Sequence, residues 1–368
     1  MPSESKPDQS KPSGRAGSSG HPGAPSRPGP LGGSAPDSGP PGGGLPLREG
    51  AGGESVRDLQ QRLRRLGLGV AAEEAGSYGA ATAAAVTEFQ RQRGLREDGV
   101  CGAQTWNALV EAGWSLGQRL LYYRNRMLRG DDVAALQLTL GSLGFDAGRV
   151  DGIFGPETHD AVTDFQRNAG LTVDGICGPS TLETLARIST KAEDEVVAGV
   201  RERERLRGTP PTLQGRKVVV GEAGGLAALA DATRRVLMRT GASVVTLHDP
   251  DESSQASQAN ALEAEVYLGL RLDADGCGCA SSFFRGRHGF ESEGGRLLAG
   301  AIQAVVPESV GVPDLGIQGM ALPVLRETRM PAVVVELGPA KVVVEHTAEV
   351  AAALARALRN WVNAPCSD

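Results

Sequence analysis

The sequence predicts a multidomain protein in which two small three-helix modules precede an α/β domain with a mostly parallel sheet flanked by helices. Three observations predict this fold class. One segment of about 55 residues occurs twice in the first half of the chain. Valine-rich runs alternate with helical stretches in the second half, which is typical of an α/β domain. The first 53 residues are almost entirely Pro, Gly, Ser and Ala with scattered charges.

The N-terminal segment 1–53 is predicted to be a disordered arm. Stretches such as PGPLGGSAPDSGPPGGGLP cannot bury enough apolar surface to offset the entropy lost on ordering. A second segment of unusual composition, 189–215, alternates acidic residues with arginines and ends in a Pro-Pro pair. Such alternation indicates an exposed helix or linker and not a binding face.

The repeat defines two modules, 54–114 and 130–188. The run VRDLQQRLRRLGLG matches VAALQLTLGSLGFD at an offset of 77, and residues 78–109 match 154–185 at an offset of 76. Apolar residues recur at helical spacing in each copy, so three helices are expected per module. Each copy also carries an Asp-Gly-x-Cys-Gly turn before its last helix, and the Gly after Asp suits a positive φ.

Composition excludes several function classes. The net charge is −6 and no stretch combines basic clusters with aromatic residues, which argues against nucleic acid as a partner. No run of 18 apolar residues is present, so no membrane span is expected. No signal peptide is visible, so the cytoplasm is the expected compartment, with cell-wall association as the alternative. An odd number of cysteines without a secretion signal argues against a disulfide framework; the five lie at positions 101, 177, 277, 279 and 366.

The C-terminal domain is expected at 216–364. Its predicted strands are 216–220, 243–247, 266–272, 281–286 and 332–337. Helical stretches are predicted between and after them, at 226–240, 253–264, 292–305 and 346–362. In such a domain the groups of the site are expected near the strand ends.

The repeated segment, with its DGIFGPETHDAVTDFQRNAGLTVDGICGPSTLETL, resembles the peptidoglycan-binding domain family of bacterial cell-wall hydrolases. The match is close in the second copy, whereas the first copy has VAAEEAGSYG and lacks one Asp-Gly pair. The resemblance implies recognition of a cell-wall glycopeptide. Asp151, Gln166 and Asp174 are the candidates for polar contacts with it. The alternative is that the motif residues only build turns and core.

The C-terminal domain resembles the zinc-dependent N-acetylmuramoyl-L-alanine amidases. The matching pieces are KVVV, TGASVVTL, SQANALEAEVYLGLRL and VLRETRMPAVVVELG. From about residue 54 the order of parts resembles the CwlM-like proteins of actinobacteria. That resemblance implies a regulator of peptidoglycan synthesis in the cytoplasm, which works through proteins of the cell-wall synthesis pathway.

The amidase resemblance implies a zinc ion held by His, Glu and His, with a catalytic Glu after the last strand. A catalytic zinc needs three protein ligands and an open position. Here the loop after the first strand reads GEAGGLAALA without a His, and the third ligand position is Arg271, whose guanidinium has no lone pair to donate. Glu222 is a weak candidate for the Glu ligand, and His248 and His288 are possible substitutes. Glu336 matches the catalytic carboxylate.

Two functions remain open from the sequence. In the first, the chain is a catalytically degenerate amidase that needs no cofactor and acts by binding peptidoglycan, its precursors and proteins. In this case Glu336 is vestigial, and Arg271 is expected to neutralise it at a distance within about 6 Å. In the second, the chain is an active zinc-dependent amidase that hydrolyses the bond between muramic acid and L-alanine. A wall-binding adaptor with an inert C-terminal scaffold is a third possibility.

Overall fold

The computed structural model describes residues 44–70, 73–189, 197–273, 276–287 and 290–363. Most of the expected arm lies outside these ranges. Its last residues belong to the first module: Leu47 is buried, and its backbone N–H and C=O both pair with those of Cys101. The first module therefore begins earlier than residue 54, because a buried residue before that point contributes to its core.

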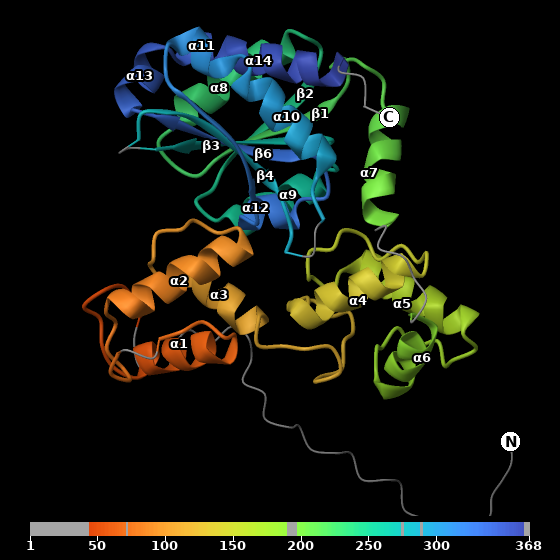
Figure 1. Ribbon diagram of the computed structural model, residues 1–368. Helices are drawn as coiled ribbons and strands as arrows, with labels where there is room; N and C mark the ends of the chain where they lie inside the picture. The colour runs from red at the N-terminus through yellow and green to blue at the C-terminus, as the bar shows by residue number, and fades with distance from the viewer. Residues whose placement is uncertain (1–43, 71–72, 190–196, 274–275, 288–289, 364–368) are drawn as a thin grey trace, which may run out of the picture. The chain divides into compact units, whose positions relative to one another are not determined.

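Each module contains three helices, as predicted (Figure 1). The first has α1 (Glu54–Arg65), α2 (Ala80–Arg93) and α3 (Ala103–Glu111), and the second has α4 (Asp131–Ser142), α5 (Pro156–Asn168) and α6 (Pro179–Ser189). Each has its own apolar core, which includes Phe89 in the first and Phe165 in the second. The glycines of the two equivalent turns, Gly99 and Gly175, have φ of +65° and +69°, as expected for these positions.

The second module also begins before its expected boundary at residue 130. Leu121 is fully buried in its core, and its backbone pairs in both directions with Cys177. This pairing repeats that of Leu47 with Cys101 in the first module. Both equivalent cysteines are buried free thiols, and burial raises the pKa of each to about 12.

The expected linker contains one described helix, α7 (Val197–Gly208). It contacts the start of α10 (Glu293–Gln303), where Ser292 Oγ donates to Glu202 Oε1 at 2.6 Å. Arg203 lies 3.7 Å from Glu293 on the same helix end. The linker thus contains a helix over 197–208, whose described side chains are half-buried or exposed, and one side of it contacts the C-terminal domain.

The C-terminal domain is built on a six-stranded sheet with the order β2-β1-β3-β6-β4-β5. All neighbouring pairs are parallel except β4 with β6, so the predicted, mostly parallel sheet is confirmed. The strands are β1 (Lys217–Glu222), β2 (Ser243–His248), β3 (Val266–Leu272), β4 (Gly278–Phe284), β5 (Asp314–Met320) and β6 (Ala332–Gly338).

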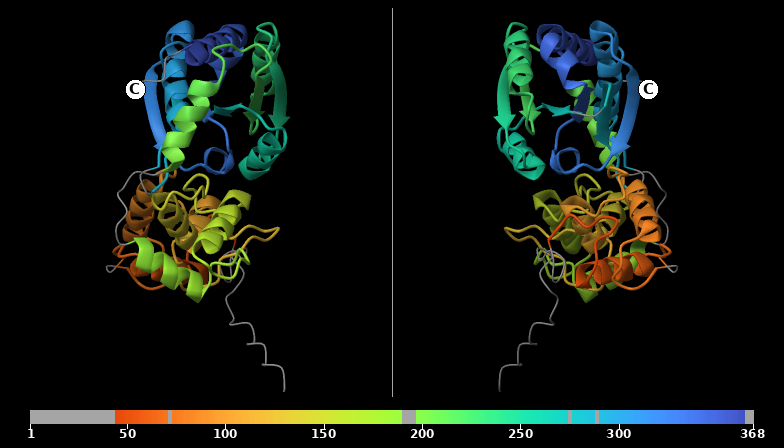
Figure 2. Two further views of the ribbon diagram at one scale, coloured as in Figure 1. Left: turned by 90° about the vertical axis from the view of Figure 1, so that its right-hand side faces the viewer. Right: turned by 90° about the vertical axis from the view of Figure 1, so that its left-hand side faces the viewer.

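Helices cover both faces of this sheet (Figure 2). One face packs against α8 (Ala227–Met238), α10 (Glu293–Gln303) and α14 (Thr347–Asn363), around a core that includes Leu268, Val333 and Leu354. The other face packs against α9 (Glu252–Ala261) and α12 (Pro323–Glu327). None of the described helices is long and apolar enough to cross a membrane.

Four elements were not predicted from the sequence. The strand β5 lies at the sheet edge, and its residues are mostly exposed and include Gly316 and Gly319, so it lacks the apolar run of a buried strand. The three helices are short: α11 (Val306–Val310), α12 and α13 (Ala340–Glu345). Helices of five or six residues carry too little periodicity to be recognised.

Candidate functional site

Two pairs of polar side chains lie at the carboxyl ends of the parallel strands. Glu222 ends β1 and is in register with His248, which ends β2. Arg271 of β3 is in register with Glu336 of β6. Because parallel strands end at the same edge of a sheet, both pairs lie at one edge. Side chains alternate between the two faces of a sheet, so Glu222 points to the face covered by α8, and Arg271 and Glu336 point to the face covered by α9. This edge is where the amidase resemblance places its zinc site.

Glu336 is neutralised by Arg271, the partner expected from the sequence. Arg271 Nη1 donates to Glu336 Oε1 at 2.9 Å. The other terminal nitrogen, Nη2, donates to Glu252 Oε1 in the first turn of α9. The three side chains are 17–23% exposed, and a guanidinium held between two carboxylates satisfies charges that would otherwise be costly to bury.

A second arginine, which the sequence did not reveal, also reaches Glu336. Arg96 follows α2 of the first module, and its Nη2 donates to Glu336 Oε1 at 2.7 Å. Beside it, Ala321 N donates to the carbonyl of Gly94 at 2.8 Å. Two arginines therefore face two carboxylates, Glu336 and Glu252, and the formal charges of the cluster sum to zero.

Glu222 is engaged in hydrogen bonds on both carboxylate oxygens. Its Oε1 lies 3.0 Å from His248 Nδ1, and its Oε2 accepts from the backbone N–H groups of Gly224 at 2.8 Å and Leu226 at 3.2 Å. Burial raises the pKa of Glu222, but the hydrogen bonds from His248 and the two N–H groups outweigh burial, so the net pKa is lowered. The local loop thus stabilises the ionised form of this carboxylate.

These residues do not fit a catalytic zinc ion. Within the described ranges no group of three or more His, Cys, Asp or Glu side chains could hold a metal. Glu222 and His248 supply two donors, and the third position carries a guanidinium that repels cations. His288, the other possible substitute, lies outside the described residues.

In the second module, Gln166 and Asp174 hold a turn. Gln166 Nε2 donates to Asp174 Oδ1 at 2.8 Å and to Thr181 Oγ1 at 3.2 Å, while its Oε1 accepts from Gly175 N at 2.9 Å. The same arrangement links Gln90, Asp98 and Thr105 in the first module. Hydrogen bonds from Ile176 N and Gln166 lower the pKa of Asp174. Gln166 is buried within the module, whereas Asp174 lies at the surface, where a ligand contact stays a prediction.

Asp151 holds the other turn of this module. Its Oδ1 accepts from Gln137 Nε2 at 2.9 Å and from Ile153 N at 2.8 Å. Burial raises the pKa of this carboxyl group. The first module has no Asp at the corresponding point, but Gln60 bonds to Gly76 N and Ser77 O as Gln137 bonds to Gly152 N and Ile153 O. Both copies thus keep the glutamine contacts of this turn, and the first lacks only the aspartate.

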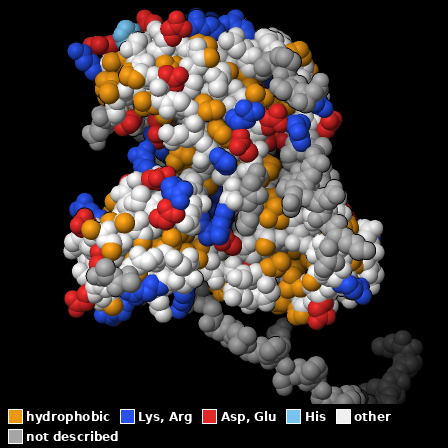
Figure 3. All heavy atoms as spheres, in the orientation of Figure 1, with side chains coloured by type: hydrophobic (Ala, Val, Ile, Leu, Met, Phe, Trp, Pro, Cys, Tyr) orange, Lys and Arg blue, Asp and Glu red, His pale blue; other side chains and the backbone are white. Residues whose placement is uncertain are grey.

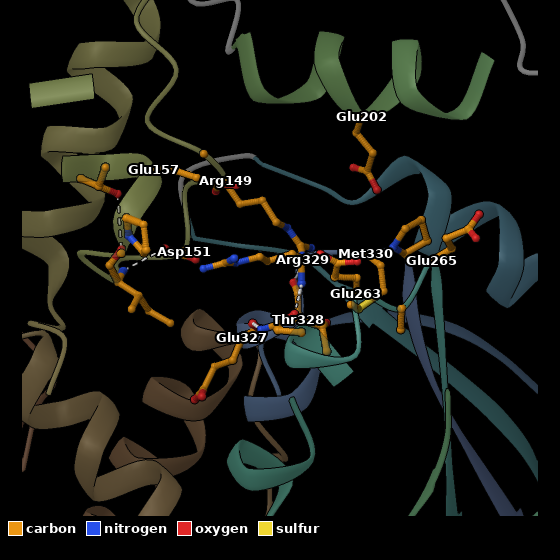
Figure 4. Close-up of a pocket in the computed structure, with 18 of the residues that line it drawn as sticks. Arg149, Asp151, Glu157, Glu202, Glu263, Glu265, Glu327, Thr328, Arg329 and Met330 are labelled. Atoms are coloured by element: carbon orange, nitrogen blue, oxygen red, sulfur yellow. Dashed lines mark hydrogen bonds between the residues drawn. The ribbon is translucent and has the colours of Figure 1, made fainter. Parts of the chain in front are cut away.

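Asp151 also lines a cavity of about 970 Å³ (Figure 4). Arg149 enters it from the loop before α5, donates through Nη1 to the carbonyl of Thr328, and has its Cζ 4.5 Å from the ring centroid of Phe284. Its Nε and Nη2 have no partner in the described part of the chain, and neither has Glu202 Oε2. Burial lowers the pKa of Arg149. The first module has Glu73 at the position equivalent to Arg149, 76 residues earlier. The arginine is therefore not part of the repeated pattern.

Comparisons with known proteins find relatives of both parts of the chain. A family model described as putative peptidoglycan binding domain matches residues 52–109 and 129–185. The N-acetylmuramoyl-L-alanine amidase CwlM of Mycobacterium tuberculosis is 38% identical over 283 residues, which cover 69% of this chain and 70% of that protein. A probable N-acetylmuramoyl-L-alanine amidase of Bacillus licheniformis is 34% identical over 154 residues, 38% of this chain and 44% of that protein. The solved N-acetylmuramoyl-L-alanine amidase from Clostridium difficile 630 matches with a TM-score of 0.36 and 18% identity, over 41% of this chain and 98% of that one.

Proposed function

Because this chain belongs to the family of N-acetylmuramoyl-L-alanine amidases, together with CwlM, we propose that it binds peptidoglycan or its precursors without cleaving them. The ion pair of Arg271 with Glu336 is the observation that carries this proposal. It puts a fixed cation at the position where the amidase resemblance calls for a metal ligand. The function proposed is regulation of peptidoglycan synthesis through binding.

The chemistry of amide hydrolysis supports this proposal. A zinc ion lowers the pKa of its bound water and polarises the scissile carbonyl, and a nearby carboxylate accepts the proton of the water. In this chain Glu336 Oε1 accepts from both Arg271 and Arg96, so two cations stand beside the carboxylate where the family has a zinc ion. At an effective dielectric constant of about 20, two unit charges about 4 Å apart interact by about 4 kcal/mol. Each arginine would therefore oppose a cation placed beside it, and the two arginines already neutralise Glu336 and Glu252.

Peptidoglycan binding is assigned to the two modules that the family model matches. Basic and acidic side chains are interspersed on the face seen in Figure 3, so charge alone does not select a nucleic acid or an anionic surface. We assign the C-terminal domain to contacts with proteins of the cell-wall synthesis pathway. The proposed compartment is the cytoplasm, with cell-wall association as the alternative.

An active zinc amidase is the second candidate, since Glu336 is retained and the relatives carry the amidase name. The two are separated by incubating the full chain with purified peptidoglycan and excess zinc, and measuring release of stem peptides by mass spectrometry. The proposal expects co-sedimentation with peptidoglycan and no peptide release, while an established amidase run in parallel releases peptides. Release that is abolished in the Glu336→Gln variant would overturn it in favour of the enzyme.

A further inference from the structure

Two adjacent tyrosines are exposed on the segment that leads into α4. Tyr122 is 40% exposed and Tyr123 is 46% exposed, and Leu120 and Met127 of the same segment are 53% and 39% exposed. No phenylalanine or tryptophan among the described residues is exposed to this degree. We name residues 120–127 the aromatic strap. Exposed apolar side chains gathered in one short segment mark a binding surface more often than a solvated one.

The aromatic strap is held firmly by the second module. Leu121 N donates to Cys177 O at 3.3 Å, Cys177 N donates to Leu121 O at 2.8 Å, and the Leu121 side chain is fully buried. Just past the strap, Arg129 forms a bridge with Ile153. The ring of Tyr123 lies 6.0 Å from the ring of His159 on α5. Both ends are thus fixed, so a ligand would meet rings that are already positioned.

The first module shows that its fold does not require this segment. There the equivalent bridges join Leu47 to Cys101 and Gly52 to Ser77. Only the four residues REGA lie between Leu47 and Gly52, against the seven residues YYRNRML between Leu121 and Arg129. The extra length and both tyrosines belong to the second module alone, and they contribute little to its core because they are exposed.

The chemistry of the aromatic strap indicates an acidic sugar chain. A tyrosine offers a flat apolar face together with a hydroxyl group, which suits a ligand with an apolar face and many polar substituents. Arg124 follows directly, and its Nε donates to Arg126 O at 2.7 Å. No acidic side chain pairs with the Arg124 guanidinium in the described part of the chain, so it is available to a carboxylate.

We propose that the aromatic strap binds peptide-free glycan strands of peptidoglycan, with sugar rings stacked on Tyr122 and Tyr123 and the carboxylate of muramic acid, which is free only where the stem peptide is absent, near Arg124. This assignment rests on the proposed function, which it deepens by naming the module and the part of the polymer that is recognised. It places glycan recognition on a segment outside the repeated motif, while Gln166 and Asp174 maintain the fold that holds the segment.

The test is calorimetric titration of the full chain with two separate probes. One is a peptide-free fragment of alternating N-acetylglucosamine and N-acetylmuramic acid, and the other is the free stem peptide. We expect the glycan fragment to bind and the affinity to fall about tenfold in each of Tyr122→Ala and Tyr123→Ala. The control is Leu315→Ala, an equally exposed apolar side chain on β5 that is 51% exposed, and it should leave the affinity unchanged. Unchanged thermal unfolding of each variant excludes loss of fold.

The outcomes separate this inference from the proposed function. If whole peptidoglycan or the stem peptide binds the wild-type chain but the glycan fragment does not, the inference is wrong and the proposed function stands. The same holds if the glycan binds equally well to both tyrosine variants. If none of the three ligands binds, the proposed function itself is contradicted.

Discussion

Arg271 and Glu336 lie opposite each other on neighbouring parallel strands, with Nη1 of one 2.9 Å from Oε1 of the other. Both stand at the sheet edge where the amidase resemblance calls for a metal ligand and a catalytic base. Arg271 also bonds to Glu252, and Arg96 also bonds to Glu336. The centre is therefore an ion-pair network, and its members can be tested separately.

Removal of Arg271 should destabilise the C-terminal domain. In Arg271→Ala, Glu252 and Glu336 lose their shared partner, and their charges repel one another at a site that is about one-fifth exposed. Allowing for solvent screening, we expect a loss of about 1–3 kcal/mol in the free energy of unfolding. Denaturant titration measures it. Arg96→Ala is the matched control, because Arg96 is 57% exposed, and its loss should stay below about 1 kcal/mol.

Glu222 should make stability depend on pH on the acid side. Its folded-state pKa is lowered, whereas an unfolded Glu has a pKa of about 4.3. The folded state therefore binds fewer protons at low pH, and the stabilisation present above the unfolded pKa is lost as the pH falls through the folded value.

The measurement is the free energy of unfolding between about pH 6 and pH 3 for the wild type and for Glu222→Gln. The wild type should lose more stability over this range than the variant. Equal slopes for both proteins would show that the Glu222 carboxylate is not stabilised by His248 and the loop.

Gln166 should be essential for the stability of the second module, because its amide holds a turn by hydrogen bonds. In Gln166→Ala, the N–H of Gly175 and the hydroxyl of Thr181 lose a buried partner, so about 2–4 kcal/mol of stability should be lost. Gln90→Ala should have the same effect on the first module, because it makes the same bonds. The control Gln92→Ala removes only a surface bond to Glu88. If Gln166→Ala were as mild as this control, the turn would not depend on the amide.

Arg149 should anchor the loop before α5 to the C-terminal domain. It donates to Thr328 O and stacks on Phe284, so Arg149→Ala should speed hydrogen exchange at residues 325–331, where opening of the structure is then less costly. Arg167→Ala, which removes an exposed pair with Asp164, should leave exchange unchanged. Equal exchange in both variants would argue against an anchoring role.

Local patterns in the sequence account for much of the fold. The repeat offsets predicted both three-helix modules, and short apolar runs predicted five of the six strands, because buried helices and strands impose their own periodicities. The strand β5 was missed because it is an exposed edge strand with two glycines. The predicted starts of both modules were too late. Leu47 and Leu121 each pair with one cysteine through an isolated β-bridge, and a single bridge gives no periodic pattern in the sequence.

The candidate site was likewise predicted only in part. The pairing of Arg271 with Glu336 was predicted from the amidase resemblance, which puts both residues at one site, together with the need of a buried carboxylate for a cation. Arg96 could not be predicted, because it is 240 positions from Glu336 and only the tertiary fold brings it there. Arg149 could not be recognised from the repeat, because the first copy has Glu73 at the matching position. The sequence shows which groups need partners, whereas only the tertiary structure shows which distant residues supply them.

The zinc content of the full chain tests the central claim most directly. The protein is purified without chelators from zinc-supplemented cells and measured by inductively coupled plasma mass spectrometry, with Glu222→Gln prepared in parallel. Because Arg271 and Arg96 supply the positive charge at this centre, we expect only trace zinc, equal in both proteins. About one zinc per chain in the wild type, lost in Glu222→Gln, would show a working metal site and contradict the account.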